Sequence, residues 1–251
     1  MRHPPVSIAQ VPLVAVAHGS RDPRAAATVE DLLAAVRRGR PGLPVLTSYL
    51  DHSAPSPVQV LGGLSGRAVV LPLLLTAAYH SKIDIPGVLA EVHTRRPRLE
   101  LRTAATLGPH PLLVAALERR LAEVGVAVGD PSTAVVLVAA GSSDPAANAV
   151  IARIARSWET RGWWAVRPAY ASAARPTPAE AIAALYRAGA PRVAVASYFL
   201  APGHFADKVR AEALAAGATV VSPVLGAAPE VADLVLYRHA EALTDVRAAA
   251  G

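Results

Sequence analysis

The sequence predicts an α/β protein made of two similar halves, each with a parallel sheet flanked by helices. Short apolar runs rich in Val and Leu alternate with stretches whose apolar residues recur at helical spacing. Helix-start signals stand between them, such as Asp22 followed by Pro23. The order of segments also occurs twice in the 251-residue chain. Such a repeat, with a period of half the chain, indicates a duplicated α/β unit.

The composition predicts a core of small apolar side chains and an anionic partner. Hydrophobic residues make up 53% of the chain but aromatic residues only 4%, so Ala, Val and Leu must fill the core. A net charge of +6 suits an acidic ligand. The arginines are scattered, without aromatic–basic interleaving, which favours a small anion over nucleic acid. With no cysteine, disulfides and thiolate-held metals or clusters are excluded for this chain.

We expect a soluble, cytoplasmic protein. The N-terminus imitates a signal peptide, with Arg2, an apolar run and Ala15-Val16-Ala17. However, Pro4, Pro5 and Pro12 break this run, and the same pattern recurs in mid-chain. The run Val69–Leu75 is far shorter than the ~20 residues that a transmembrane helix needs.

The first half begins with a buried strand, Leu13–Ala17, which ends at His18 and Gly19. Gly19 permits a sharp turn, and Asp22 then caps a helix that Gly39 can end. Strands and helices continue to alternate, with expected ranges of Val45–Leu50, Val58–Leu64, Ala68–Leu75, Ile83–Val92, Leu99–Thr106 and Leu112–Glu123. We expect an N-terminal half of residues 1–128 and a C-terminal half of residues 129–251.

The second half repeats the turns of the first but not its reactive side chains. Scaffold residues recur as Gly19/Gly141, Ser20/Ser142, Asp22/Asp144 and Pro23/Pro145. By contrast, His18 is replaced by Ala140, Asp51 by Ser172 and His110 by Ala228, while His80 keeps the counterpart His204. Because both halves share the fold, we expect the N-terminal half to carry the active site and the C-terminal half to be a degenerate copy.

Three motifs together resemble the sirohydrochlorin chelatases, the ATP-independent class II enzymes that insert cobalt or iron into sirohydrochlorin. They are Ala17–Pro23, Leu50-Asp51 with Pro55-Ser56, and Leu73–Leu75 leading to His80 and Asp84-Ile85-Pro86. The resemblance covers nearly the whole chain, including the two-copy form. It implies a chelatase-like fold with a cleft between two α/β halves, and a monomer that is a covalent pseudo-dimer.

The resemblance implies that His18 and His80 are catalytic and hold the divalent metal over the macrocycle. Neutral imidazole is a suitable ligand for Fe²⁺, Co²⁺ or Ni²⁺ and a suitable proton acceptor near neutral pH. The family pattern has Glu where this chain has the shorter Asp51. The resemblance therefore implies that Asp51 is catalytic, either through water or as a proton acceptor, and it leaves open whether Asp51 binds the metal directly.

No cofactor is expected beyond the substrate metal, Fe²⁺ or Co²⁺, and no ATP-binding GxxxxGK[ST] motif is present. Sirohydrochlorin is an anionic tetrapyrrole, so cationic and polar residues near the two histidines are candidates to bind it. These candidate residues are Ser20, Arg21, Arg24, Lys82 and His204.

Two alternatives remain open. A carrier of tetrapyrrole or metal would keep the same residues without inserting the metal. A histidine-phosphatase-like hydrolase also places His-Gly after a strand, but its motif has Arg immediately before the histidine, where this chain has Ala17. Nucleic acid and membrane partners are not expected.

Overall fold

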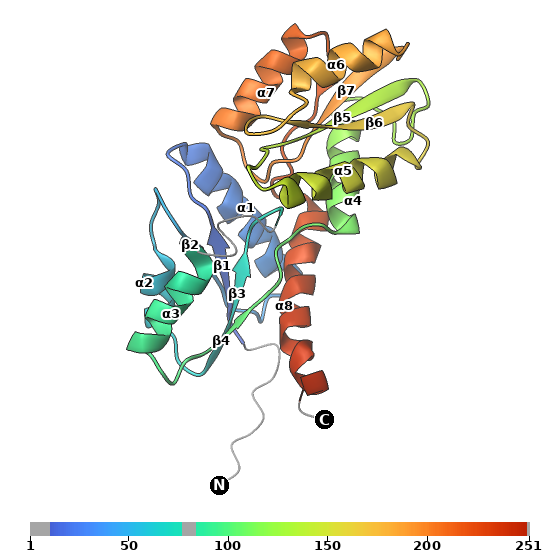
Figure 1. The fold of residues 1–251 in the computed structure, drawn as a ribbon. Coiled ribbons are helices and arrows are strands. Elements are labelled where there is room, and N and C mark those ends of the chain that lie inside the picture. The colour runs from blue at the N-terminus through green and yellow to red at the C-terminus, as the bar shows by residue number, and fades with distance from the viewer. Residues whose placement is uncertain (1–10, 77–83, 250–251) are drawn as a thin grey trace. The chain divides into compact units, whose positions relative to one another are not determined.

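Two parallel four-stranded sheets form the fold, which confirms the predicted α/β class (Figure 1). The structure is a computed structural model that describes residues 11–76 and 84–249, with side chains up to residue 244. The chain divides into two units. Unit 1 comprises Met1–Gly108 and Val231–Gly251, and unit 2 comprises Pro109–Glu230.

Unit 1 contains sheet A, whose strand order is β2-β1-β3-β4. All of its strand pairs are parallel, and Leu13 of β1 lies opposite Val45 of β2 and Val69 of β3. Its elements are β1 (Leu13–Ala17), α1 (Pro23–Gly39), β2 (Val45–Tyr49), α2 (Pro57–Gly62), β3 (Arg67–Pro72), α3 (Ile85–Arg95), β4 (Glu100–Thr103) and most of α8 (Pro229–Ala249).

Unit 2 contains sheet B, with the matching order β6-β5-β7-β8. Its pairs are also parallel, and Ala134 of β5 lies opposite Ala165 of β6 and Val193 of β7. Its elements are α4 (Pro111–Ala122), β5 (Thr133–Ala139), α5 (Pro145–Glu159), β6 (Ala165–Tyr170), α6 (Pro178–Arg187), β7 (Arg192–Ser197), α7 (His204–Ala215) and β8 (Val220–Val221).

The central strands are buried on both faces because helices cover each sheet on both sides. Every residue of β1 and β5 is buried, as continuous apolar runs predict for parallel strands. The clusters around them consist mainly of Ala, Val and Leu, which matches the low aromatic content of the chain.

The helices begin where the sequence places their caps. The side chains of Asp22 and Asp144 accept backbone N–H bonds at the starts of α1 and α5. Ser56 with Gln59, and Thr177 with Glu180, form capping boxes at α2 and α6. The two copies therefore use the same local chemistry to start equivalent helices.

Several elements are shorter than the sequence predicts. β3 ends at Pro72 rather than Leu75, and β4 ends at Thr103 rather than Thr106. The apolar residues beyond these strands are still held at the sheet edge, because Leu107 donates its N–H to the carbonyl of Leu74 at 2.9 Å. The apolar runs therefore indicate where the chain is buried rather than where the strand ends, because burial continues beyond the regular ladder of hydrogen bonds.

The two units do not follow the two sequence copies, because the copies exchange their last helices. The first copy ends with α4, which lies in unit 2, and the second copy ends with α8, most of which lies in unit 1. The expected halves, 1–128 and 129–251, therefore differ from the units. The repeat itself gives no reason for the exchange, because both helices carry apolar residues at the same positions, such as Leu113 and Val231.

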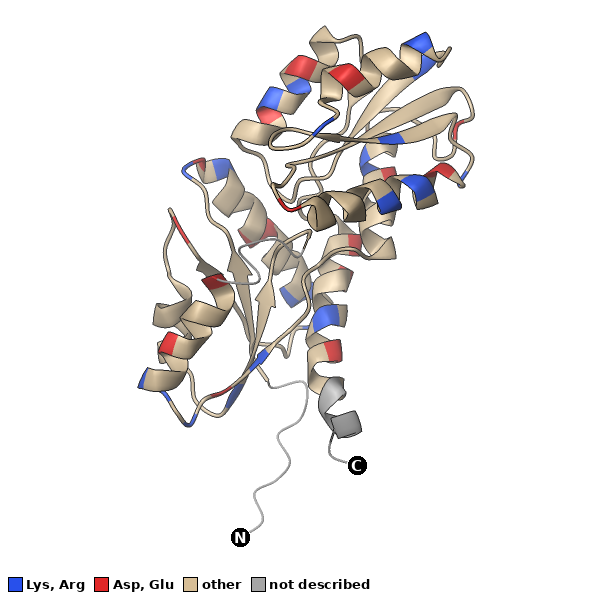
Figure 2. Ribbon diagram, in the orientation of Figure 1, with Lys and Arg blue, Asp and Glu red and all other residues tan. Residues whose placement is uncertain are grey.

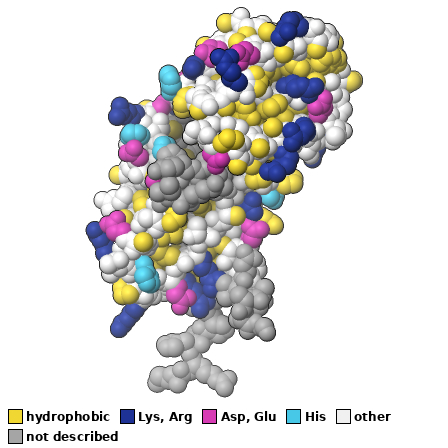
Figure 3. All heavy atoms as spheres, viewed as in Figure 1, with side chains coloured by type: hydrophobic (Ala, Val, Ile, Leu, Met, Phe, Trp, Pro, Cys, Tyr) yellow, Lys and Arg dark blue, Asp and Glu magenta, His cyan; other side chains and the backbone are white. Residues whose placement is uncertain are grey.

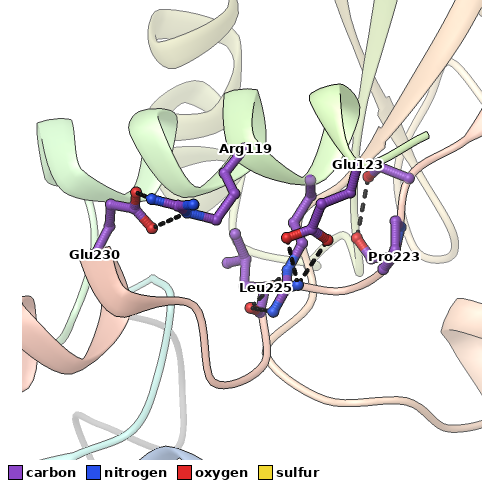
Figure 4. Close-up of polar contacts among 7 residues, drawn as sticks. Arg119, Glu123, Pro223, Leu225 and Glu230 are labelled. Carbon is purple, nitrogen blue, oxygen red and sulfur yellow. Dashed lines mark hydrogen bonds and ion pairs between the residues drawn. The ribbon is translucent and has the colours of Figure 1, made fainter. Parts of the chain in front are cut away.

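Specific contacts hold each exchanged helix in its unit. In unit 2, Arg119 of α4 pairs with Glu230 at 2.6 Å (Figure 4). Arg120 donates to the carbonyl of Leu225 at 2.8 Å (Figure 4). In unit 1, buried His239 of α8 contacts the carbonyl of Val11 through Nε2 at 3.0 Å. Each unit thus needs chain from both copies.

Charged side chains are spread over both units rather than gathered on one element (Figure 2). On the face shown in Figure 3, charges of both signs lie among apolar and neutral polar surface. On this face, the mixture of charges agrees with the scattered arginines of the sequence. None of the helices within residues 11–76 and 84–249 has the length and apolar character needed to cross a membrane.

Candidate functional site

The candidate site lies at the carboxyl edge of sheet A. His18 follows β1, and Asp51 and His52 follow β2, which is the neighbour of β1 in the sheet. Because the strands are parallel, the residues after each strand meet at the same edge, where α/β proteins bind ligands. The side chains of His18 and Asp51 are both exposed there.

Gly19 locks the ends of these two strands together. The N–H of Asp51 donates to the carbonyl of His18 at 2.9 Å. Gly19 has a φ of +93°, and a Cβ on it would lie 1.7 Å from the carbonyl oxygen of Asp51. A side chain cannot be accommodated at this distance. The sequence therefore correctly identified Gly19 as a turn residue, and the structure adds that the turn fixes Asp51 beside His18.

Asp51 is held by the next residue, His52, which the sequence analysis did not select. The backbone N–H of His52 donates to Asp51 Oδ1 at 2.8 Å, and His52 Nε2 lies 3.3 Å from Asp51 Oδ2. His52 has a φ of +58°, which is a left-handed backbone conformation. Its counterpart in the second copy is Ala173, so the same internal comparison that selected His18 also identifies His52.

The two arginines beside His18 differ in their surroundings. Arg21 is exposed. Arg24 forms a two-point pair with Asp22, with Nη2–Oδ2 at 2.5 Å and Nε–Oδ1 at 3.0 Å. The hydrogen bonds from Arg24 hold the pKa of the Asp22 carboxyl below its ordinary value. Arg24 thus neutralises the carboxylate that caps α1, whereas Arg21 projects its charge from the turn.

Ser20 makes the same side-chain hydrogen bond as its counterpart Ser142, but its main chain has a different partner. Its Oγ accepts the N–H of Asp22 at 3.1 Å, as Ser142 does for Asp144 at the same distance. In the second copy, Asn148 closes the turn by binding both the N–H and the carbonyl of Ser142. The first copy has Ala26 at that position, and the carbonyl of Ser20 instead accepts from Ser53 Oγ at 3.4 Å.

The remaining sequence-predicted residues fall elsewhere. His80 and Lys82 lie in residues 77–83, outside the described residues. His204 lies in unit 2, where it is exposed at the first turn of α7. Within residues 11–76 and 84–249, no three His, Asp or Glu side chains are grouped to hold a metal ion. Any metal held through His18 and His80 therefore involves a residue that the structure does not describe.

His110 has a structural role that the sequence did not settle. It is the N-cap residue of α4, and its Nδ1 accepts the N–H of Leu112 at 3.2 Å. Because α4 belongs to unit 2, this histidine lies in the other unit from His18. In the second copy, Ala228 stands at the equivalent position before α8.

A family model described as CbiX matches the chain twice, over residues 12–124 and 134–242. The chain belongs to the CbiX family. Both matches begin at the first strand of a sheet and end in an exchanged helix. They therefore confirm the duplication and the family resemblance that the sequence motifs indicated.

Two curated relatives come from Priestia megaterium. One, a sirohydrochlorin cobaltochelatase, is 29% identical over 75% of this chain and 63% of its own length. The other, a sirohydrochlorin ferrochelatase, is 32% identical over 58% of this chain and 55% of its own length. The chain thus spans about three fifths of the length of these relatives.

Solved structures of chelatases share the fold. SirB from Bacillus subtilis with Fe³⁺ superposes with a TM-score of 0.82 at 24% identity, covering 95% of this chain and 97% of that chain. CbiX, titled as the terminal enzyme of siroheme biosynthesis in denitrifying bacteria, gives a TM-score of 0.66 at 19% identity over 93% and 98% of the two chains. At these identities, the likeness establishes the two-unit CbiX fold.

Proposed function

We propose that the protein is a sirohydrochlorin chelatase that inserts Fe²⁺ or Co²⁺ into sirohydrochlorin without ATP. The observation that carries this proposal is the carboxyl edge of sheet A, where His18 and Asp51 stand on a turn that the second copy reproduces with Ala140 and Ser172. Relatives named as cobaltochelatase and ferrochelatase support the substrate class.

The proposed reaction exchanges two pyrrole protons for one divalent metal ion. In this proposal His18, with His80, binds the incoming metal through neutral imidazole nitrogens, which suit Fe²⁺ and Co²⁺. The metal must lose water and the macrocycle must lose two protons, so a base near the ligands speeds the exchange. Asp51, whose backbone is fixed 2.9 Å from the carbonyl of His18, is suitably placed to take part in proton removal.

The carboxylates of the tetrapyrrole are proposed to meet cationic and polar groups around the turn. Arg21 supplies an exposed charge directly after Ser20, and charge-assisted hydrogen bonds to carboxylates are the strongest available contacts. The N–H of Ser20, beside which the first copy has Ala26 in place of Asn148, adds a second polar contact. Lys82 and His204 remain proposed contacts, and Arg24 contributes less because it already pairs with Asp22.

The test is metal insertion measured by the absorbance change of sirohydrochlorin under anaerobic conditions, with Fe²⁺ and Co²⁺ assayed separately. We expect the protein to accelerate insertion and His18→Ala to abolish most of the acceleration. His93→Ala is the matched control, because His93 is an exposed histidine on α3. A protein that binds sirohydrochlorin or metal without accelerating insertion would instead be a carrier, and the proposal would be wrong.

A further inference from the structure

The dyad of Asp51 and His52 has the geometry of a carboxylate that orients an imidazole. Asp51 Oδ2 lies 3.3 Å from His52 Nε2, and Oδ1 accepts the backbone N–H of His52 at 2.8 Å. Both carboxylate oxygens are therefore directed at one residue. A carboxylate beside a ring nitrogen favours the tautomer in which that nitrogen carries the proton. Nδ1 of His52 is then the nitrogen with the lone pair.

The left-handed backbone of this loop does not itself require histidine. His52 has a φ of +58°, and Ala173 in the second copy has a φ of +57°. The surrounding hydrogen bonds also repeat, because Ser53 donates its N–H to the carbonyl of Asp51 at 2.7 Å and Ala174 does the same to Ser172 at 2.7 Å. An alanine is thus sufficient for the fold, and the imidazole is an addition specific to the first copy.

The dyad also lies where a macrocycle held by His18 would be within reach. Asp51 is joined to His18 by the 2.9 Å backbone bond. The side chains of Asp51 and His52 are 62% and 34% exposed, so a ligand at the sheet edge can reach them. The second copy replaces His18, Asp51 and His52 together by Ala140, Ser172 and Ala173, which indicates that the three side chains serve one purpose.

We infer that His52, oriented by Asp51, is a catalytic base that removes the pyrrole protons of the tetrapyrrole during metal insertion. The inference rests on the proposed function. A pyrrole N–H bond breaks, its electron pair stays on the pyrrole nitrogen that binds the metal, and the proton passes to Nδ1 of His52. The resulting imidazolium is stabilised by the Asp51 carboxylate. Water then takes the proton from Nδ1, and the neutral ring accepts the second pyrrole proton.

This role explains how Asp51 can serve at a position where the family pattern has the longer Glu. Asp51 is one methylene shorter than Glu, so its oxygens extend less far from the strand end. Its Oδ2 lies 3.3 Å from His52 Nε2, so the ring offers its lone pair through Nδ1 and the carboxylate orients the ring. Metal binding is left to other residues.

The test is His52→Gly, because glycine accepts positive φ without strain and leaves space for an added imidazole. We expect kcat for insertion to fall about 100-fold, as for loss of a positioned base, while KM for sirohydrochlorin changes less than about threefold. Binding of Co²⁺ alone, followed by its visible absorption, should remain unchanged. Added imidazole should restore at least about tenfold of the lost rate. His52→Asn, which also tolerates positive φ, should lose as much activity.

The matched control is Ala173→Gly, which makes the same backbone change at φ +57° in the second copy. We expect this variant to keep full activity, and its response to added imidazole measures how much metal the imidazole removes from the assay. If His52→Gly retains wild-type kcat, or loses activity without any rescue, His52 is not the base. If the wild-type protein itself inserts no metal, the proposed function is wrong, which is a distinct result.

Discussion

The carboxyl edges of sheets A and B have nearly the same backbone and different side chains. At sheet A, Asp51 donates its N–H to the carbonyl of His18 at 2.9 Å, and at sheet B, Ser172 donates to the carbonyl of Ala140 at 2.9 Å. A Cβ on Gly19 would lie 1.7 Å from a carbonyl oxygen, and one on Gly141 would lie 1.9 Å from the equivalent oxygen. The side chains at this edge can therefore change while the backbone of the turn stays the same.

The second copy is therefore a structural control for the first. Wherever the same turn exists with Ala or Ser, the fold does not depend on the reactive side chain. Where both copies keep the same residue, as with Gly19 and Gly141, the backbone requires it.

Ending the chain after Glu230 should unfold unit 1 and leave unit 2 folded. The deletion removes α8 beyond the unit boundary, including Val231, Leu234 and Val235, which are fully buried. Each buried aliphatic side chain contributes about 1.5–3 kcal/mol, so the loss approaches the whole stability of a small domain. Denaturant unfolding followed by fluorescence of the tryptophans, all of which lie in unit 2, should show one transition retained.

The control for this truncation is circular dichroism, which should report loss of the helices and strands of unit 1. Two intact transitions in the truncated protein would contradict the assignment of α8 to unit 1. They would instead support halves that follow the sequence repeat.

Gly19→Ala and Gly141→Ala should each destabilise their own unit by about 3 kcal/mol or more, because either Cβ meets a carbonyl oxygen at a positive φ. Urea unfolding measures the shift of each transition. The two losses should agree within about 1 kcal/mol. If only Gly19→Ala is destabilising, the two turns are not equivalent and the second copy is a poor control.

His18→Ala should reduce kcat/KM for insertion at least about 100-fold, equivalent to about 2.7 kcal/mol. Its thermal midpoint should stay within about 2 °C of the wild type, because Ala140 occupies the same place in the second copy. The reverse change, Ala140→His, should give no added activity. A folded His18→Ala protein with normal activity would remove His18 from the mechanism.

His239 should make the stability of unit 1 sensitive to pH. Burial lowers the pKa of its imidazole below the ordinary 6.5, while the Val11 carbonyl acts in the opposite direction. The unfolded chain then binds more protons than the folded chain. The free energy of unfolding is therefore constant above about pH 6.5 and falls as the pH drops below it. The total loss is about 1.4 kcal/mol for each unit by which folding lowers the pKa.

The control is His239→Leu, because Leu121 is the fully buried counterpart of His239 in unit 2. Urea unfolding between pH 5 and 8 should show that this variant loses the acid-side decline of unit 1. An unchanged slope in His239→Leu would assign the pH dependence to another group.

Arg21→Ala should raise KM for sirohydrochlorin about threefold to tenfold, whereas Arg24→Ala should change it less than about twofold. The reason for the small effect of Arg24→Ala is that Arg24 is already paired with Asp22 at 2.5 Å. The effect of Arg21→Ala is itself moderate, because an exposed charge pair with a substrate carboxylate contributes at most about 1 kcal/mol. Raising the salt concentration should reduce the difference between wild type and Arg21→Ala. Equal effects of both substitutions would show that the pairing with Asp22 does not withhold Arg24 from the substrate.

The fold class and the duplication follow from the sequence alone, which also selected His18 and Asp51, two residues that the structure places at one edge of sheet A. Alternating apolar runs, Asp22-Pro23 and Gly19 act through local backbone geometry, which is encoded within a few residues. The comparison of His18 with Ala140 needed only the repeat. The same comparison, of His52 with Ala173, was open to the sequence, but the contact of His52 with Asp51 is visible only in the folded loop.

Only the tertiary structure decided which sheet each final helix covers. α4 and α8 bury the same pattern of residues, with Leu113, Leu117 and Leu121 matching Val231, Val235 and His239. A repeated pattern fits either of two similar sheets, so the sequence predicted halves of 1–128 and 129–251. Long-range contacts select the exchange, among them His239 with Val11 and Arg120 with the carbonyl of Leu225. Such contacts join residues more than 100 positions apart, and no local propensity specifies them.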